Sequence, residues 1–143
     1  MVHALKEAWR TLVPHGTLID VRPLSTDVPL EIVYEGGSDE AGMVDMSPEI
    51  DLDISADSAI TTVTSEGIYT QLNEEYFSFT YYWKTVKGMQ EDIAEFWEGE
   101  VNIPEQVWQQ ARLLFNKRRP KTQIRLATRM KLGVYVKDGG EEG

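Results

Sequence analysis

The sequence predicts an α/β domain, because segments of helical periodicity alternate with segments typical of strands along its 143 residues. Three observations carry this prediction. Residues 2–21 begin as an amphipathic helix, turn at Pro14 and Gly16, and continue as a buried strand. An aromatic strand is expected over 76–83, and a long alternating strand over 122–137.

The composition fits one folded domain, which we expect over residues 1–137, followed by an acidic flexible tail over 138–143. The chain has no cysteine, which excludes a disulfide framework, a thiolate metal site and a cysteine nucleophile. Its net charge of −10 argues against binding to nucleic acid or to an anionic membrane. The sequence has neither a signal peptide nor an apolar run of roughly 18 residues, so we expect a cytoplasmic protein.

The elements follow in order along the first half. Val2, Leu5 and Trp9 recur at helical spacing, and Thr17 to Val21 is rich in strand-forming residues. Alternating residues over 30–34 predict a strand, which would return as a hairpin over 43–46 after the glycine-rich loop GGSDEAG. An acidic loop is expected next over 48–53, and then a short helix that begins at Ser55 or Asp57 and ends at Gly67.

In the second half, four aromatic residues at alternate positions share one face of the strand 76–83: Phe77, Phe79, Tyr81 and Trp83. Thr85 is expected to cap the next helix, and Pro104 to stand in the first turn of the one after it. Over 122–137 apolar residues at even positions alternate with charged or polar ones, which predicts an antiparallel strand with one wet face. Gly133 is expected to mark a bulge in it.

The segment ALKEAWRTLVPHGTLIDVRP resembles part of the class I S-adenosylmethionine-dependent methyltransferases, in particular the type 11 group. That group joins a hydrophobic helix to its fifth strand through an L-x-P-x-G turn. The resemblance implies a partial Rossmann-like sheet flanked by helices. Residues 17–21 would be its fifth strand and 76–83 its sixth, with 122–137 as the seventh, antiparallel strand between them. Residues 49–67 would be an insertion after the fifth strand.

The family binds its cofactor with a glycine-rich turn after the first strand and with residues that end the next three strands. No position of this sequence corresponds to them, and GGSDEAG contains no G-x-G-x-x-G. The resemblance therefore implies the substrate-side half of the fold without the cofactor-binding half. We expect no cofactor on this chain alone, and S-adenosylmethionine only if another chain supplies the missing half.

Four residues are candidates for ligand binding. Asp20 and Arg22 share a strand face near the end at which open α/β sheets bind ligands, and Arg22 could hold an anionic substrate. A structural ion pair with Asp20 or with a nearby loop is the interpretation we favour. Tyr81 and Trp83 could stack on a planar ligand, although packing beneath the following helices explains them more simply.

We predict no catalytic residue and no metal site. His3 and His15 are the only histidines, and the acidic run 45–57 lacks the spacing of a calcium loop. Eight Lys and Arg stand in 117–137 with no acid among them. We expect four of them on a strand face, balancing nearby acids: Arg125, Arg129, Lys131 and Lys137. An anion-binding patch is the alternative.

Without the front half of the fold, the strand containing Thr17, Ile19 and Val21 would be an exposed apolar edge. Two copies are expected to pair through it, unless the hairpin arm 29–34 folds back over it. The leading functional hypothesis is thus a methyltransferase-like binding or dimerisation module that is not catalytic alone. One alternative is a methyltransferase half completed by a cofactor-binding chain or a second copy. The other is an unrelated small α+β ligand-binding domain.

Overall fold

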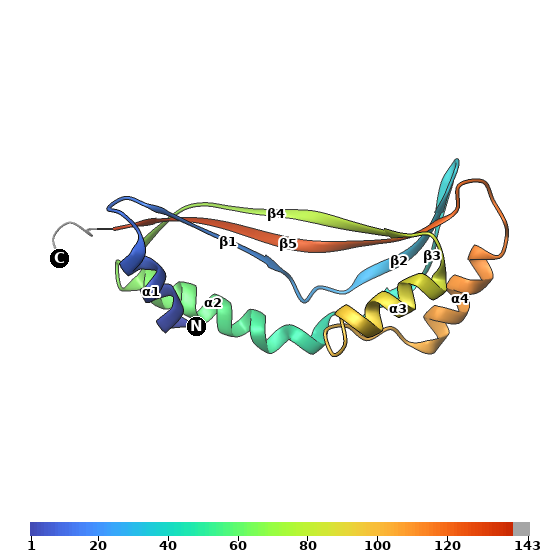
Figure 1. Ribbon diagram of the computed structural model, residues 1–143, viewed down its shortest axis with the longest axis horizontal. Coiled ribbons are helices and arrows are strands. Elements are labelled where there is room, and N and C mark those ends of the chain that lie inside the picture. The colour runs from blue at the N-terminus through green and yellow to red at the C-terminus, as the bar shows by residue number, and fades with distance from the viewer. Residues whose placement is uncertain (139–143) are drawn as a thin grey trace. The chain divides into compact units, whose positions relative to one another are not determined.

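The computed structural model describes residues 1–138, which form an α/β structure with an open, antiparallel sheet (Figure 1). The predicted α/β class is confirmed. The elements are α1 (Val2–Thr11), β1 (Thr17–Pro23), β2 (Val28–Tyr34), β3 (Gly37–Val44), the 3-10 turn η1 (Ser47–Glu49), α2 (Ile50–Ser65), β4 (Tyr69–Trp83), α3 (Val86–Phe96), α4 (Glu105–Phe115) and β5 (Gln123–Lys137). None of the helices described is long and apolar enough to cross a membrane. The tail expected over 138–143 lies outside the described residues except for Asp138.

The chain divides into two compact units, each of which has its own apolar core. Among the described residues, unit 1 comprises 1–23, 51–77 and 130–138, and unit 2 comprises 24–50 and 78–129. The two long strands contribute to both, because the division falls within β4 and within β5.

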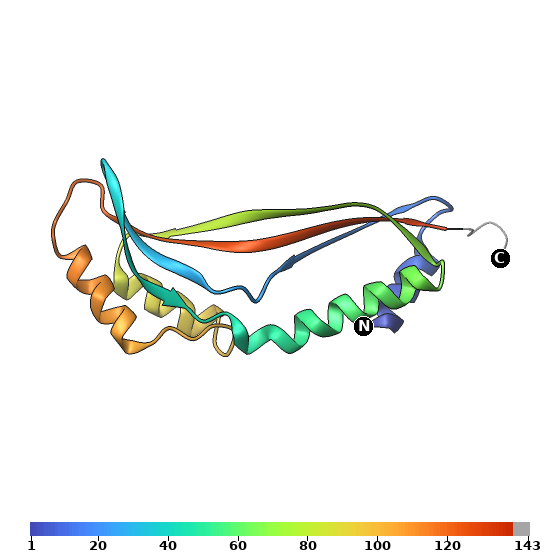
Figure 2. The same ribbon diagram turned by 180° about the vertical axis from the view of Figure 1, so that it is seen from behind.

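Unit 1 is built on the C-terminal part of β5. This part pairs antiparallel with β1, from Thr17 opposite Val136 to Pro23 opposite Met130, and β4 also pairs with β5. The helices α1 and α2 lie on the same face of this small sheet (Figure 2). Its core is small: Val63, Tyr69 and Tyr135 form one buried cluster, and the two other buried apolar residues of α2 are alanines, Ala56 and Ala59.

Unit 2 contains the β2–β3 hairpin, the N-terminal part of β5, and the helices α3 and α4. β2 pairs with β5 from Leu30 opposite Leu126 to Val33 opposite Gln123. A bulge shifts the β2–β3 register after Leu30. Its core is larger and is made of 14 buried residues, including Leu30, Ile32, Met89, Ile124 and Leu126.

Two segments expected as loops are regular structure instead. Most of the glycine-rich segment belongs to β3, because Glu35 and Gly36 supply the hairpin turn, Gly36 with a φ of 99°. The expected acidic loop 48–53 is the end of η1 and the start of α2, which begins at Ile50 rather than at Ser55 or Asp57. Asp51 and Asp53 stand in its first turn, where the helix dipole favours carboxylates.

The bulge predicted at Gly133 does not occur in the β1–β5 pairing, whose register continues past this residue without a shift. The glycine is instead covered by the ring of Tyr135. A Cβ at position 133 would lie 2.6 Å from the Tyr135 hydroxyl oxygen and 2.7 Å from its Cε2. Thr85 does cap α3 as expected, since its hydroxyl oxygen accepts a hydrogen bond from the Gly88 N–H at 2.9 Å.

The predicted wet face of β5 is confirmed in unit 2 and wrong in unit 1. In unit 2 the even-numbered Ile124 and Leu126 are buried, as the alternation predicts. In unit 1 the odd-numbered Tyr135 and Lys137 are buried instead, while Leu132, Val134 and Val136 are only half-buried. The apolar residues of this part of β5 therefore lie on the face away from the core.

Candidate functional site

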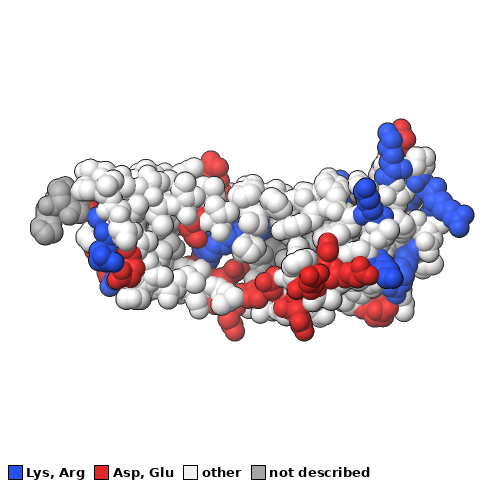
Figure 3. Space-filling view, viewed as in Figure 1, with Lys and Arg blue, Asp and Glu red and all other residues white. Residues whose placement is uncertain are grey.

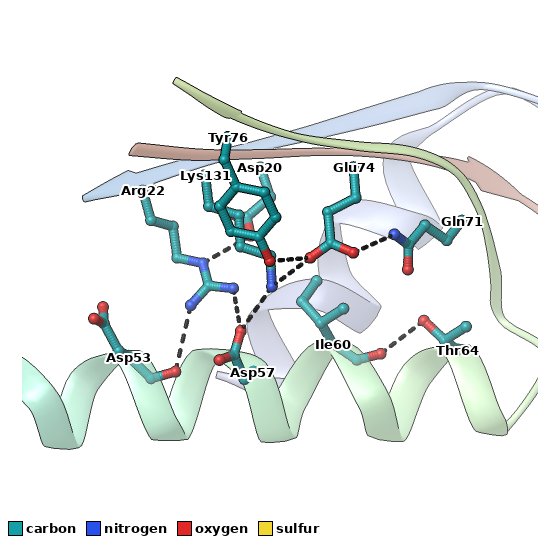
Figure 4. Close-up of polar contacts among 10 residues, drawn as sticks. All are labelled: Asp20, Arg22, Asp53, Asp57, Ile60, Thr64, Gln71, Glu74, Tyr76 and Lys131. Carbon is teal, nitrogen blue, oxygen red and sulfur yellow. Dashed lines mark hydrogen bonds and ion pairs between the residues drawn. The ribbon is translucent and has the colours of Figure 1, made fainter. Parts of the chain in front are cut away.

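The candidate pair Asp20 and Arg22 lies in a polar cluster of unit 1, formed by β1, β4, β5 and α2 (Figure 4). Both side chains come from alternate positions of β1 and point toward α2. Arg22 Nε donates to Asp20 Oδ2 at 2.9 Å, and Arg22 Nη2 lies 2.5 Å from Asp57 Oδ1. Arg22 Nη1 also donates to the backbone carbonyl of Asp53 at 3.3 Å. The guanidinium is therefore held on three sides.

Lys131 of β5 extends the cluster to β4. Its Nζ lies 3.3 Å from Asp57 Oδ1 and 2.9 Å from Glu74 Oε1. Tyr76 donates its hydroxyl to Glu74 Oε1 at 2.9 Å, and its ring centroid is 6.0 Å from the Lys131 Nζ. Asp57 is thus shared by two cations, and Glu74 by a cation and a phenol.

The cluster favours the charged forms of Asp57, Glu74 and Lys131. The hydrogen bond from Arg22 lowers the pKa of Asp57, and the hydrogen bond from Lys131 lowers the pKa of Glu74. The pKa of Lys131 is raised, chiefly by its hydrogen bond to Glu74.

Chemically, these groups are already engaged with one another. The Arg22 side chain is only 12% exposed, and its donors point to acceptors of the same unit. The arrangement joins α2 to the sheet of unit 1 through charge-assisted hydrogen bonds. This geometry fits the structural interpretation of Asp20 and Arg22 better than the binding of an anionic substrate.

The other two candidates, Tyr81 and Trp83, belong to an aromatic group in unit 2. Their rings are stacked, with centroids 5.9 Å apart, and the Tyr81 ring meets that of Trp97 edge to face at 4.9 Å. Trp83 donates its Nε1–H to Asp92 at 2.8 Å. Trp83 and Trp97 also pack against the core of unit 2. These aromatic contacts fit packing within the unit better than stacking on an outside ligand.

The predicted edge residues lie on the outer strand of unit 1. Among residues 1–138, β1 pairs with β5 alone, so its second edge has no strand partner there. Ile19 is 60% exposed and Val21 is 49% exposed. The register places Val134 opposite Ile19 and Leu132 opposite Val21 on the same face. We call these residues, together with Val136, the uncovered strip: Ile19, Val21, Leu132, Val134 and Val136.

Sequence patterns predict only one half of the polar cluster. Lys131 is predicted to balance an acid, and it does so, as Arg125 does with Glu31 at 3.0 Å. The partners of Lys131, Asp57 and Glu74, are not predictable in this way, because no local pattern relates residues more than 50 positions apart. The contact depends on the strand register and on the position of α2.

Lys137 differs from its expected role. It does not lie on a wet strand face but is 6% exposed. Its Nζ donates to the Leu12 carbonyl oxygen at 2.7 Å and lies 4.1 Å from the ring centroid of Trp9. The ammonium thus sits at the C-terminus of α1, where the helix dipole and an aromatic ring both favour a cation.

No group of three or more His, Cys, Asp or Glu side chains within residues 1–138 is arranged to hold a metal ion. His15 occupies the turn before β1 with a φ of 63°, outside the polar cluster. Comparisons with protein-family models, curated proteins and solved structures found no match.

Proposed function

We propose that this chain is a methyltransferase-like domain that forms a homodimer and has no catalysis of its own. The observation that carries the proposal is the free edge of β1 beside the uncovered strip. Edge strands of this kind pair readily with another chain, and proteins usually charge, shorten or cover them. Here two large apolar side chains stand on the edge strand, Ile19 and Val21, and both are about half exposed or more.

A symmetric pairing of β1 with β1 suits the residues on this strand. In an antiparallel pair centred on Val21, Asp20 of one copy would stand opposite Arg22 of the other. The two uncovered strips would become one continuous apolar surface, as an isologous interface requires. Pro23, which lacks an N–H, would end the pairing at this side.

The strand order supports the methyltransferase-like part of the proposal. β5 pairs with both β1 and β4 and runs antiparallel to β1. This is the order that the resemblance implies for the seventh strand between the fifth and the sixth, in a partial Rossmann-like sheet. An unrelated α+β domain with an aromatic-lined cavity receives less support, because Tyr81 and Trp83 are stacked on each other and on Trp97.

The same strand order favours a second candidate function. The chain would be the substrate-side half of an S-adenosylmethionine-dependent methyltransferase, completed by a cofactor-binding chain or by a second copy. Titration of the purified chain with S-adenosylmethionine in a calorimeter distinguishes the two. We expect no heat of binding up to millimolar ligand, and micromolar binding would replace the first proposal with the second. A cytoplasmic location belongs to either proposal, and the absence of cysteine fits a reducing compartment.

The dimer is tested by measuring the mass in solution with light scattering across a concentration series. We expect twice the chain mass of 16.3 kDa for the wild type. Ile19→Lys should give a monomer, because each copy would bring a charge to the pairing edge. Leu113→Lys is the matched control, since Leu113 is 65% exposed on α4 of unit 2. A wild-type monomer, or an Ile19→Lys variant that remains dimeric, would refute the proposal.

A further inference from the structure

The loop between α4 and β5 in unit 2 carries four cations within five residues: Lys117, Arg118, Arg119 and Lys121. Lys117, Arg118 and Lys121 are exposed, and none of the three forms an ion pair with another described residue. Figure 3 shows Lys and Arg gathered on the part of unit 2 that contains this loop. Two cations of β5 differ, since Arg125 and Lys131 are each paired with an acid.

Contacts of its own backbone and of Arg119 hold the loop in place. Arg119 pairs with Asp39 at 2.7 Å, and its guanidinium lies 3.6 Å from the ring centroid of Tyr34. The Pro120 carbonyl accepts the Glu35 N–H at 2.9 Å, and the Thr122 hydroxyl donates to the Arg119 carbonyl at 2.6 Å. These contacts join the loop to the β2–β3 hairpin, so its three exposed cations stand on an ordered support, with Lys117 near enough to Asp39 to help lower the pKa of that carboxyl.

Two of the exposed cations occupy backbone positions that suit glycine. Arg118 has a φ of 55° and Lys121 a φ of 58°, both in the left-handed region. A residue other than glycine pays conformational energy there, so glycine would form this loop at lower cost. The backbone N–H groups of Arg119 and Lys121 also have no acceptor within the part of the chain that the structure describes. Cationic side chains and backbone N–H groups without an acceptor therefore occur together in a turn whose backbone is strained.

We propose that the loop of residues 116–122 binds a phosphate group carried by a soluble small molecule. Three cations and free backbone N–H groups are the donors that recognise a phosphate dianion. The ligand should be compact, because the chain as a whole has a net charge of −10 and would repel an extended polyanion such as nucleic acid or an anionic bilayer. The site belongs to unit 2 and does not depend on the dimer edge proposed for unit 1.

The test is a titration of the isotope-labelled full chain with pyrophosphate, followed by amide resonances and repeated by calorimetry. We expect the resonances of residues 116–122 to shift in a saturable manner. The double variant Arg118→Gly/Lys121→Gly should bind at least ten-fold more weakly. Because glycine relieves the backbone at both positions, this variant should fold at least as well as the wild type, and its thermal midpoint should not fall.

Lys6→Ala/Arg10→Ala is the matched control, since it removes the same amount of charge from exposed positions of α1. It should bind pyrophosphate as the wild type does. Equal weakening in both double variants would mean a general charge effect and would overturn the proposal, as would the absence of any saturable shift. Sedimentation with phosphatidylcholine vesicles containing phosphatidic acid distinguishes a soluble phosphate ligand from a lipid headgroup. Binding to these vesicles without binding to free pyrophosphate would also overturn the proposal of a soluble ligand.

Discussion

Units 1 and 2 attach helices to a sheet by different means. In unit 2 the contact is apolar, with residues such as Leu30, Ile32 and Met89 fully buried between the strands and the helices. In unit 1 α2 has a smaller apolar contact, with Val63 packed beside Tyr69 and Tyr135, and it is also joined to the strands by ions, because Asp57 binds both Arg22 and Lys131. The comparison shows that one α/β pattern can rest mainly on burial in one part of a chain and combine a small core with charge pairing in another.

The strand β5 takes part in both arrangements. Its even-numbered leucines illustrate the difference, since Leu126 is fully buried in unit 2 whereas Leu132 is half-buried on the outer face of unit 1. The face of β5 that holds the core in unit 2 is left uncovered in unit 1. We therefore expect unit 2 to supply most of the apolar stabilisation and unit 1 to supply the surface for association.

The largest expected effect separates these two leucines. Leu126→Ala should lower the free energy of unfolding by about 2–5 kcal/mol, because it removes buried methyl groups and leaves a cavity. Leu132→Ala in the monomer should cost less than about 1 kcal/mol, because its side chain already contacts water. Chemical denaturation at low protein concentration measures both. Equal losses would show that the uncovered strip is packed as tightly as the core of unit 2.

A smaller effect is expected from the ions of unit 1. Arg22→Ala should destabilise the protein by about 1–2 kcal/mol, because Asp20 and Asp57 would lose their main partner in a partly buried setting. Arg10→Ala breaks an exposed pair with Glu7 on α1 and should cost about 0.5 kcal/mol or less. The same denaturation experiment compares the two variants. If Arg22→Ala is as mild as Arg10→Ala, the polar cluster does not hold α2.

The smallest effect is a dependence on pH. The pKa values of Asp57 and Glu74 are lowered in the folded protein, so these carboxylates stabilise it above their ordinary pKa near ~4, and this contribution is lost as the pH falls through the lowered values. Asp57→Asn should thus destabilise the protein at pH 7 and have a smaller effect at pH 3. The loss caused by Leu126→Ala should change little between the two pH values. If Asp57→Asn destabilised the protein equally at pH 7 and pH 3, the charge of Asp57 would not contribute to stability through the polar cluster.

The sequence by itself determined the order of most elements. The α/β class, the first helix and strand, the aromatic C-terminal half of β4, the Thr85 cap and the final long strand all followed from local periodicity and capping, whereas the start of β4 at Tyr69 did not. These features depend on neighbours within a few residues, so a single sequence contains the information. β3 and α2 begin earlier than their patterns predict, because glycine and aspartate, which favour loops, also occur in an edge strand and at a helix N-terminus.

Only the tertiary structure decided which face of β5 is covered and which ions meet. The alternation over 122–137 predicts a single apolar face, yet the covering helices leave Leu132, Val134 and Val136 outside the core of unit 1. Burial depends on where a helix packs and not on strand periodicity alone. In the same way, Arg22 and Lys131 share Asp57 because β1, β5 and α2 place residues remote in the sequence within hydrogen-bond reach.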